Sequence, residues 1–151
     1  YAVPEEAMHM GNLPRKGAKY FIDFNSAMAV FALYLSIIGD ILNDKELSFR
    51  YKRVYFALKT RINSMMWSSE DSFYYDLDEE GHQIKNKHIG AFWTLLAEIP
   101  NDEYASFLIE ALKNDSEFGT DNPFPTLPVS NPEFSKDGNG YCGSVSSFMT
   151  Y

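Results

Sequence analysis

Residues 26–38 read SAMAVFALYLSII, a stretch that decides the fold because a helix made from it is apolar on every side. Asp23 or Asn25 can cap its start, and Gly39 is placed to end it. A helix without a polar face must be covered all round by other elements. The apolar run is shorter than the ~20 residues that a bilayer crossing needs, so we expect a buried core helix and no membrane span.

The next segment, 45–66, predicts a helix with one apolar face. Asn43 and Asp44 can cap it, and its apolar side chains recur at spacings of three and four residues, with basic side chains between them. This spacing is typical of a helix on the surface of a domain. The apolar face consists of Leu47, Tyr51, Val54, Tyr55, Leu58, Ile62, Met65 and Met66.

A second pair of segments repeats this order. Residues 89–99 are nearly all apolar and stop before Pro100, and Asn101 or Asp102 can then cap a one-faced helix over 103–114. Stacked helical hairpins produce such an alternation when one helix of each pair lines an interior and its partner faces water. An ordinary helical bundle produces it too, so the sequence pattern predicts an all-α fold and leaves these two architectures open.

Two segments lie outside the predicted helices. Residues 73–87 begin with aromatic side chains and pass through a polar turn at 79–81, which predicts a short β-hairpin. After Asn114 follow about thirty residues rich in proline, asparagine and glycine, a length that usually indicates a functional loop.

The composition is that of one globular unit and excludes some partners. The chain has 151 residues, of which 45% are hydrophobic, and a formal net charge of −8. Without a basic patch, neither nucleic acid nor an anionic membrane surface is an expected partner. The single cysteine, Cys142, cannot form an intrachain disulfide and has no catalytic signature around it.

Metal binding is not expected either. Residues 76–81 resemble the opening of a calcium-binding EF-hand loop, but Lys87 stands where the bidentate glutamate belongs, which favours a solvated hairpin turn. The three histidines lack the spacing that brings imidazoles to one metal, so surface or capping roles are expected for His9, His82 and His88.

Four motifs in a fixed order resemble one group of glycoside hydrolases. They are W-x-x-E-D-x-F-Y-Y-D-x-D from residue 67, K-x-I-x-x-F-W-x-L-L-A from residue 87, P-x-L from residue 125, and G-Y at 140–141. The group comprises trehalases and processing α-glucosidases, with mannosyl-oligosaccharide glucosidase and mannosylglycerate hydrolase among its relatives. The resemblance implies an (α/α)6 toroid and hydrolysis with inversion by an aspartate acid and a glutamate base.

The loop MGNLPR at 10–15 departs from this group at one decisive place. It resembles the end of the group's acid loop, S-G-x-D-x-S-P-R, with Pro14 and Arg15 matching and Gly11 where the aspartate stands. A glycine has no proton to give, and inverting hydrolysis needs two carboxyl groups about 6.5–9.5 Å apart. The resemblance puts the base beyond Tyr151, so we predict no catalytic residue within this chain.

The resemblance does imply residues that bind the substrate. Asn12 and Arg15 would line a sugar site, and Asp23 would anchor a loop or a hydroxyl at its inner rim. The remaining candidates would lie close to it. Each also has a structural alternative, such as a helix cap for Asp23. The expected partner is carbohydrate, as an α-linked oligosaccharide or disaccharide, and no cofactor is expected. The candidate residues are Asn12, Arg15, Asp23, Lys87, Trp93 and Tyr141.

We expect residues 1–151 to form a single partial segment of such a toroid within a larger catalytic domain. Missing chain segments or self-association would then cover the apolar helices. Three functions remain: an inverting hydrolase of α-linked glucosides or mannosides, a catalytically degenerate protein that binds glycans, and a helical module that kept only the scaffold. Since function depends on the site and not on the fold, the sequence leaves the choice open.

Overall fold

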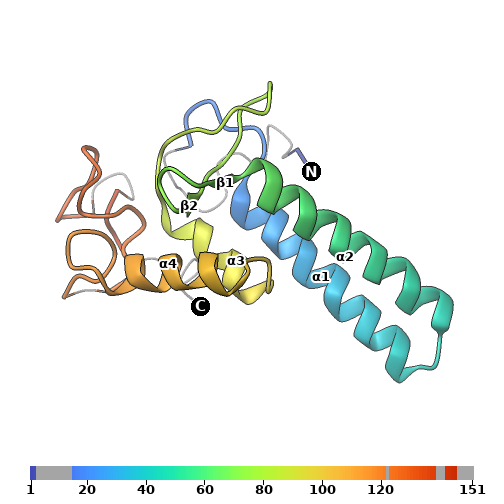
Figure 1. Ribbon diagram of the computed structural model, residues 1–151. Helices are drawn as coiled ribbons and strands as arrows, with labels where there is room; N and C mark the ends of the chain where they lie inside the picture. Colours follow the sequence, from blue (N-terminus) through green and yellow to red (C-terminus); the bar gives the residue numbers. More distant parts are fainter. Residues whose placement is uncertain (3–14, 122, 139–141, 146–151) are drawn as a thin grey trace.

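The computed structural model describes residues 1–2, 15–121, 123–138 and 142–145 (Figure 1). Within these ranges the chain is mainly helical, which confirms the expected class. The helices are α1 (Ile22–Ile41), α2 (Lys45–Met65), the 3-10 helix η2 (Ile89–Phe92), α3 (Trp93–Leu96) and α4 (Asp102–Lys113), and the strands are β1 (Trp67–Ser68) and β2 (Phe73–Tyr74).

Helices α1 and α2 form a long antiparallel hairpin that extends away from the rest of the chain (Figure 1). The predicted stop at Gly39 is wrong, because α1 continues to Ile41. A Cβ at Gly39 would lie 2.6 Å from the backbone nitrogen of Ser48, so the glycine lets the two helices approach closely. The chain then reverses at Asn43, whose φ is 56°, and Asp44 caps α2 by accepting from the backbone N–H of Leu47 at 3.0 Å.

The start of α1 also differs from the prediction. The helix begins at Ile22, so Asp23 lies in its first turn and neither Asp23 nor Asn25 is its N-cap. The N-cap residue, Phe21, provides no side-chain hydrogen bond. Instead, Asp76 Oδ1 accepts from the backbone N–H of Ile22 at 2.7 Å, so the cap comes from a residue far along the chain.

Helix α1 is longer than the apolar run from which it was predicted. At 20 residues it is long and apolar enough to cross a membrane by length and composition. The length of α1 therefore does not exclude a membrane span, and the core helix of a globular domain meets the same criteria. Its Ala29, Ala32 and Ser36 are buried, and α2 packs along it.

The core joins this hairpin to the β strands and α4. The apolar face predicted for α2 is confirmed at Tyr55, Leu58 and Ile62, which are all buried. Behind it, the ring of Trp67 stacks on that of Tyr104 from α4 at 3.9 Å between centroids.

The β-hairpin lies earlier in the chain than predicted. Strands β1 and β2 pair antiparallel, with Trp67 opposite Tyr74, so the connecting loop is 69–72. The predicted turn at 79–81 does exist, with Gly81 at a φ of 88°, but one bridge between Leu77 and Gln83 takes the place of paired strands there.

The second predicted helix pair is half right. Residues 89–99 form the short elements η2 and α3 rather than one helix. Helix α4 forms as predicted, and its N-cap Asn101 accepts from the backbone N–H of Tyr104 at 2.7 Å. The long loop after α4 covers η2, because the carbonyl of Thr126, which is buried, accepts from the Ile89 N–H at 2.9 Å.

Candidate functional site

Four ionisable side chains from four parts of the chain meet in a buried group that we call the Asp76 cluster. Arg15 precedes α1, Asp23 lies in the first turn of α1, Asp76 follows β2, and His88 directly precedes η2. Asp76 and His88 are only 3% and 2% exposed, and Arg15 is buried as well. Arg15 and His88 both contact Asp76 although the three residues are far apart in the sequence, so the local sequence does not reveal these contacts.

Asp76 is the centre of the cluster, because its two oxygens accept from three donors. Oδ1 accepts from the Ile22 N–H at 2.7 Å, and Oδ2 lies 3.1 Å from His88 Nε2 and 3.3 Å from Arg15 Nη1. These donors belong to three different segments, so one carboxylate joins the start of α1, the start of η2 and Arg15. A buried carboxylate is stable only when it is bonded in this way.

Arg15 and Asp23 form a two-point ion pair. Arg15 Nη1 donates to Asp23 Oδ1 at 2.8 Å, and Nη2 donates to Asp23 Oδ2. The guanidinium also lies 4.2 Å above the ring of Phe21. The planar fork of arginine suits such bidentate pairing, so Arg15 fixes the orientation of the Asp23 carboxylate.

His88 is oriented from both ring nitrogens. Its Nδ1 accepts from the Gly90 N–H at 3.1 Å, so the ring proton lies on Nε2 and is donated to Asp76. This bond also caps η2, as the expected capping role of His88 predicted, but the residue is buried rather than on the surface. A Cβ at Gly90 would lie 2.8 Å from His88 Nδ1 and 3.2 Å from Asp23 Cβ, so η2 begins directly against α1.

The electrostatics of the cluster favour an ionised Asp76. Burial raises the pKa of this carboxyl, but His88, the Arg15 guanidinium and the Ile22 N–H outweigh burial and hold the pKa of Asp76 below its ordinary value.

Lys87 directly precedes His88, and Trp93 directly follows η2 in the chain. Lys87 Nζ is 3.2 Å from Glu117 Oε1 and 5.3 Å from the centroid of the Phe73 ring. The second carboxylate oxygen of Glu117 is buried and has no hydrogen-bond partner among the described residues. Trp93 is half-buried and begins α3.

Two candidate residues fall outside the part of the chain that the structure describes. These are Asn12 and Tyr141, and Gly11 falls outside it as well. Of the six predicted site residues, the structure thus brings Arg15 and Asp23 into direct contact, and it leaves Lys87 in a separate ion pair with Glu117.

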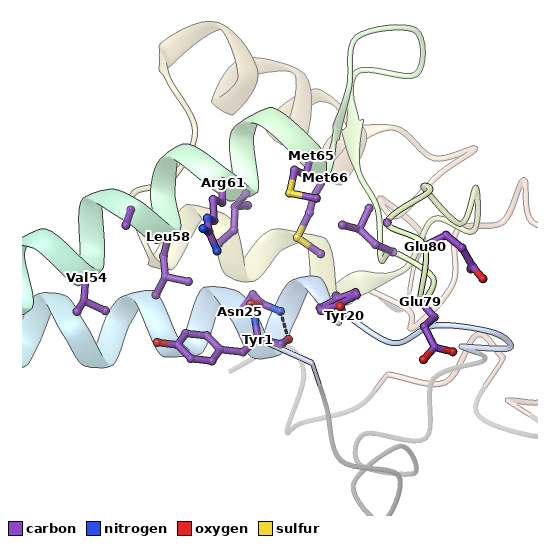
Figure 2. A pocket seen from close by; sticks show the side chains of 14 residues that line it. Tyr1, Tyr20, Asn25, Val54, Leu58, Arg61, Met65, Met66, Glu79 and Glu80 are labelled. Atoms are coloured by element: carbon purple, nitrogen blue, oxygen red, sulfur yellow. Dashed lines mark hydrogen bonds between the residues drawn. The ribbon is translucent and has the colours of Figure 1, made fainter.

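A groove of about 670 Å³ opens between α1, α2 and the turn at 79–81 (Figure 2). Val54, Leu58 and Arg61 of α2 and Asn25 of α1 line it. Its described lining contains no member of the Asp76 cluster and none of the predicted saccharide residues.

The turn at 79–81 also gathers three side chains of metal-binding type. Ligand atoms of Asp78, Glu80 and His82 lie within 4.8 Å of one another. Glu80 and His82 are exposed, and Asp78 Oδ1 already accepts from the His82 N–H at 2.8 Å. The solvated turn predicted for 76–81 is therefore right for Asp78 and Glu80 and wrong for Asp76 and Leu77, which are buried.

Comparison with known proteins gives the family. Residues 6–151 match the mannosylglycerate hydrolase MGH1-like glycoside hydrolase domain. The chain belongs to this family. An uncharacterized protein of Borreliella burgdorferi is 48% identical over 151 residues, which is 100% of this chain and 32% of the relative. The MGH1-like chain therefore spans about a third of the length of that relative.

Solved structures of glycoside hydrolases share the fold of the MGH1-like chain. A GH63 mannosylglycerate hydrolase from Thermus thermophilus, in complex with glucose, superposes with a TM-score of 0.74 at 20% identity, over 85% of this chain and 32% of its own. A sialidase gives 0.84 at 18% identity, over 99% and 14%. Neutral trehalase Nth1 from Saccharomyces cerevisiae gives 0.62 at 20% identity, over 73% and 22%. The helical chain thus matches a part of each larger structure.

The sequence did not predict that Asp76 and His88 meet in a buried cluster. Asp76 stands between Tyr75 and Leu77, both buried, and a carboxylate inside an aromatic and apolar run is a signal of a bonded buried charge. For His88, the neighbouring Ile89 and Gly90 indicated a helix start, but the contact with Asp76 depends on the fold.

Proposed function

We propose that this chain is one segment of the (α/α)6 toroid of an inverting glycoside hydrolase that acts on α-linked glucosides or mannosides. The observation that carries the proposal is the family match over residues 6–151, together with a helical fold that matches part of a mannosylglycerate hydrolase and part of a trehalase. Carbohydrate as partner is supported by the glucose complex of the related mannosylglycerate hydrolase.

We propose that the complete catalytic domain is larger than this chain. The chain spans 32% of its curated relative, so further helices and the catalytic base would come from the remaining length. The outer face of α1 supports this, because Phe31 and Ile41 are 62% and 77% exposed. Apolar side chains of this size are usually covered in a complete domain.

Within the segment, Asp23 and Arg15 would form the inner rim of the saccharide site. Asp23 is the more accessible partner of the pair, at 15% side-chain exposure against 3% for Arg15. Its carboxylate is therefore the group that would accept from a sugar hydroxyl, while Arg15 holds it. Asn12, Lys87, Trp93 and Tyr141 would complete the site, with Trp93 offering an aromatic face to the sugar ring.

A second function, saccharide binding without hydrolysis, is favoured by one specific observation. In the resemblance between MGNLPR and the acid loop of the group, Gly11 stands at the place of the aspartate. A general acid contributes about 10²–10⁴-fold to a rate, and unactivated glycosides depend on it most. A protein with this glycine would still bind sugar through its other groups.

The test compares two kinds of substrate in the full-length protein. Unactivated α-glucosides and α-mannosides need a proton on the leaving group, whereas glycosyl fluorides do not. The first function requires ordinary turnover of both kinds of substrate. Loss of the acid at Gly11 instead gives negligible turnover of the unactivated glycosides and measurable turnover of the fluorides, and Gly11→Asp should then raise turnover of the unactivated glycosides selectively, by about 10²-fold or more.

The other outcomes separate the alternatives. Rapid hydrolysis of an unactivated disaccharide by the unchanged protein would mean that another carboxylate, with Glu5 and Glu6 first to be replaced, acts as the acid. Binding without turnover of either substrate would favour the degenerate glycan-binding protein. The proposal fails if no sugar of a broad panel is turned over and none changes the tryptophan fluorescence. The variant Trp93→Phe separates the signal of Trp93 from that of buried Trp67.

A further inference from the structure

The Asp76 cluster is an expensive arrangement for stability alone. Removing a carboxylate and a guanidinium from water costs several kcal/mol per ion, and buried ion pairs are often no more stabilising than apolar side chains of the same size. Asp76 nevertheless accepts from Ile22, Arg15 and His88 at 2.7–3.3 Å. Directional hydrogen bonds fix the geometry of the groups that they join, whereas apolar packing does not.

The cluster is attached to every described residue of the proposed saccharide site. Arg15 and Asp23 are members of it. Lys87 directly precedes His88 in the chain, and Trp93 begins α3 immediately after η2, the helix that His88 caps. A shift of the Asp76 carboxylate would therefore act directly on Arg15 and His88, and through His88 on the segment that carries Lys87 and Trp93.

The cluster also has a defined direction of hydrogen bonding. The Gly90 N–H donates to His88 Nδ1, His88 Nε2–H donates to Asp76, and Arg15 donates to both carboxylates. Asp76 thus receives only donors. Replacing it by an amide would turn an NH2 group toward at least one of these donors, so the arrangement specifies a carboxylate at this position.

We infer that Asp76 and His88 are positioning residues of the saccharide site: they hold Arg15, Asp23 and the start of η2 in one arrangement without touching the sugar. This inference rests on the proposed function, because it assigns these residues a role in the same site. It adds two residues that lie outside the set implied by the resemblance.

The experiment uses the full-length protein and matched variants. Asp76→Asn keeps the size of the side chain and removes the charge. His88→Leu removes the donor to Asp76, whereas His88→Gln keeps an N–H donor of similar reach. The matched controls are Asp78→Asn and His82→Gln, because Asp78 and His82 form a second Asp–His pair, at 3.3 Å, that is largely exposed.

Each variant is first tested for folding by its melting temperature, and saccharide affinity and turnover of a glycosyl fluoride are then measured well below that temperature. We expect Asp76→Asn and His88→Leu to weaken saccharide binding or turnover by about 10- to 100-fold, because small misplacements of site groups have effects of this size. We expect His88→Gln to recover most of the loss and both controls to behave as the unchanged protein.

The outcomes distinguish this inference from the proposed function. If the unchanged protein binds sugar and Asp76→Asn and His88→Leu bind and turn over substrate equally well, the inference is overturned while the proposed function stands. Equal losses in His88→Gln and His88→Leu would also overturn it, since a donor to Asp76 would then not matter. If Asp76→Asn does not fold, the two His88 variants decide. Absence of sugar binding and turnover in the unchanged protein overturns the proposed function, and the inference with it.

Discussion

The two ends of α1 are built in opposite ways. At its first turn, polar groups are buried and bonded: Ser26 Oγ donates to the Ile22 carbonyl at 2.7 Å, Asn25 Nδ2 donates to the Phe21 carbonyl at 2.9 Å, and Asp76 accepts from Ile22. At its last turns, large apolar side chains lie open to solvent, with Ile41 77% exposed.

This difference shows which end of α1 is covered by other described residues of the chain and which end is not. The polar end of α1 depends on Asp76, 54 residues away, and that partner is present within the described chain. The apolar end has no such cover in the part of the chain that the structure describes. An apolar face left open in a segment that spans about a third of its relative fits the proposal that further helices pack there.

The largest expected effect comes from removing the carboxylate at the polar end. Asp76→Ala leaves His88 and the Ile22 N–H without their acceptor and removes one of the two carboxylates that Arg15 contacts. We expect a loss of about 3–5 kcal/mol in the free energy of unfolding, as for other broken buried ion pairs. Denaturant melts of the full-length protein measure it. Asp78→Ala, in the exposed pair with His82, is the control and should cost less than about 1 kcal/mol. Equal losses would contradict the difference drawn between a buried and a solvated pair.

The next effect tests how α1 passes α2 near the apolar end. Helix propensity alone predicts that Gly39→Ala stabilises the protein by about 1 kcal/mol. The structure predicts the opposite sign, because the added Cβ would lie 2.6 Å from the Ser48 nitrogen and 2.9 Å from its Cα, both backbone atoms. We expect a loss of about 1–3 kcal/mol, typical of overpacking. A higher melting temperature for Gly39→Ala would show that the helices do not approach as closely as described.

Asp76 and Gly39 also show which parts of the fold could be predicted from the sequence. Helix α4 could, because its cap Asn101 and the residue it caps, Tyr104, are three positions apart. The start of α1 could not, because its cap is Asp76. The stop assigned to Gly39 failed because a glycine that ends a helix and a glycine that admits a neighbouring helix look the same in one sequence.

The candidate site divides in the same way. Arg15 and Asp23 could be proposed from the motifs that resemble a glycoside hydrolase, and the structure joins them through two hydrogen bonds. Their dependence on Asp76 and His88 could not, since it requires the segment after β2 to lie against the first turn of α1. The predicted solvated turn was right for Asp78 and wrong for Asp76, because Asp76 is drawn into the cluster by Arg15, His88 and the Ile22 N–H, none of which is near it in the sequence.

A smaller effect is expected on acidification. The pKa of Asp76 in the folded protein lies below its ordinary value, which is about 3.9 in unfolded chains. Its contribution to stability is therefore fully present above the unfolded pKa and is lost as the pH falls through the folded pKa. Melting temperatures of the full-length protein, followed from near-neutral to strongly acidic pH, should fall less steeply for Asp76→Asn than for the unchanged protein. Parallel curves would mean that Asp76 does not gain from ionisation in the folded state.

The smallest effect on stability should come from the apolar end of α1 in the 151-residue chain on its own. Ile41 is exposed there, so Ile41→Ser should change the free energy of unfolding by no more than about 0.5 kcal/mol. The same substitution should reduce self-association measured by light scattering, because the uncovered face is what would join two copies.

In the full-length protein, where we propose that further helices cover this face, Ile41→Ser should instead destabilise clearly, as other losses of buried apolar groups do. If the isolated chain is a monomer with a sharp melt that does not depend on its concentration, and Ile41→Ser is neutral in both proteins, then α1 needs no further cover. The exposed end of α1 would then be an ordinary surface rather than the place where the remaining helices pack.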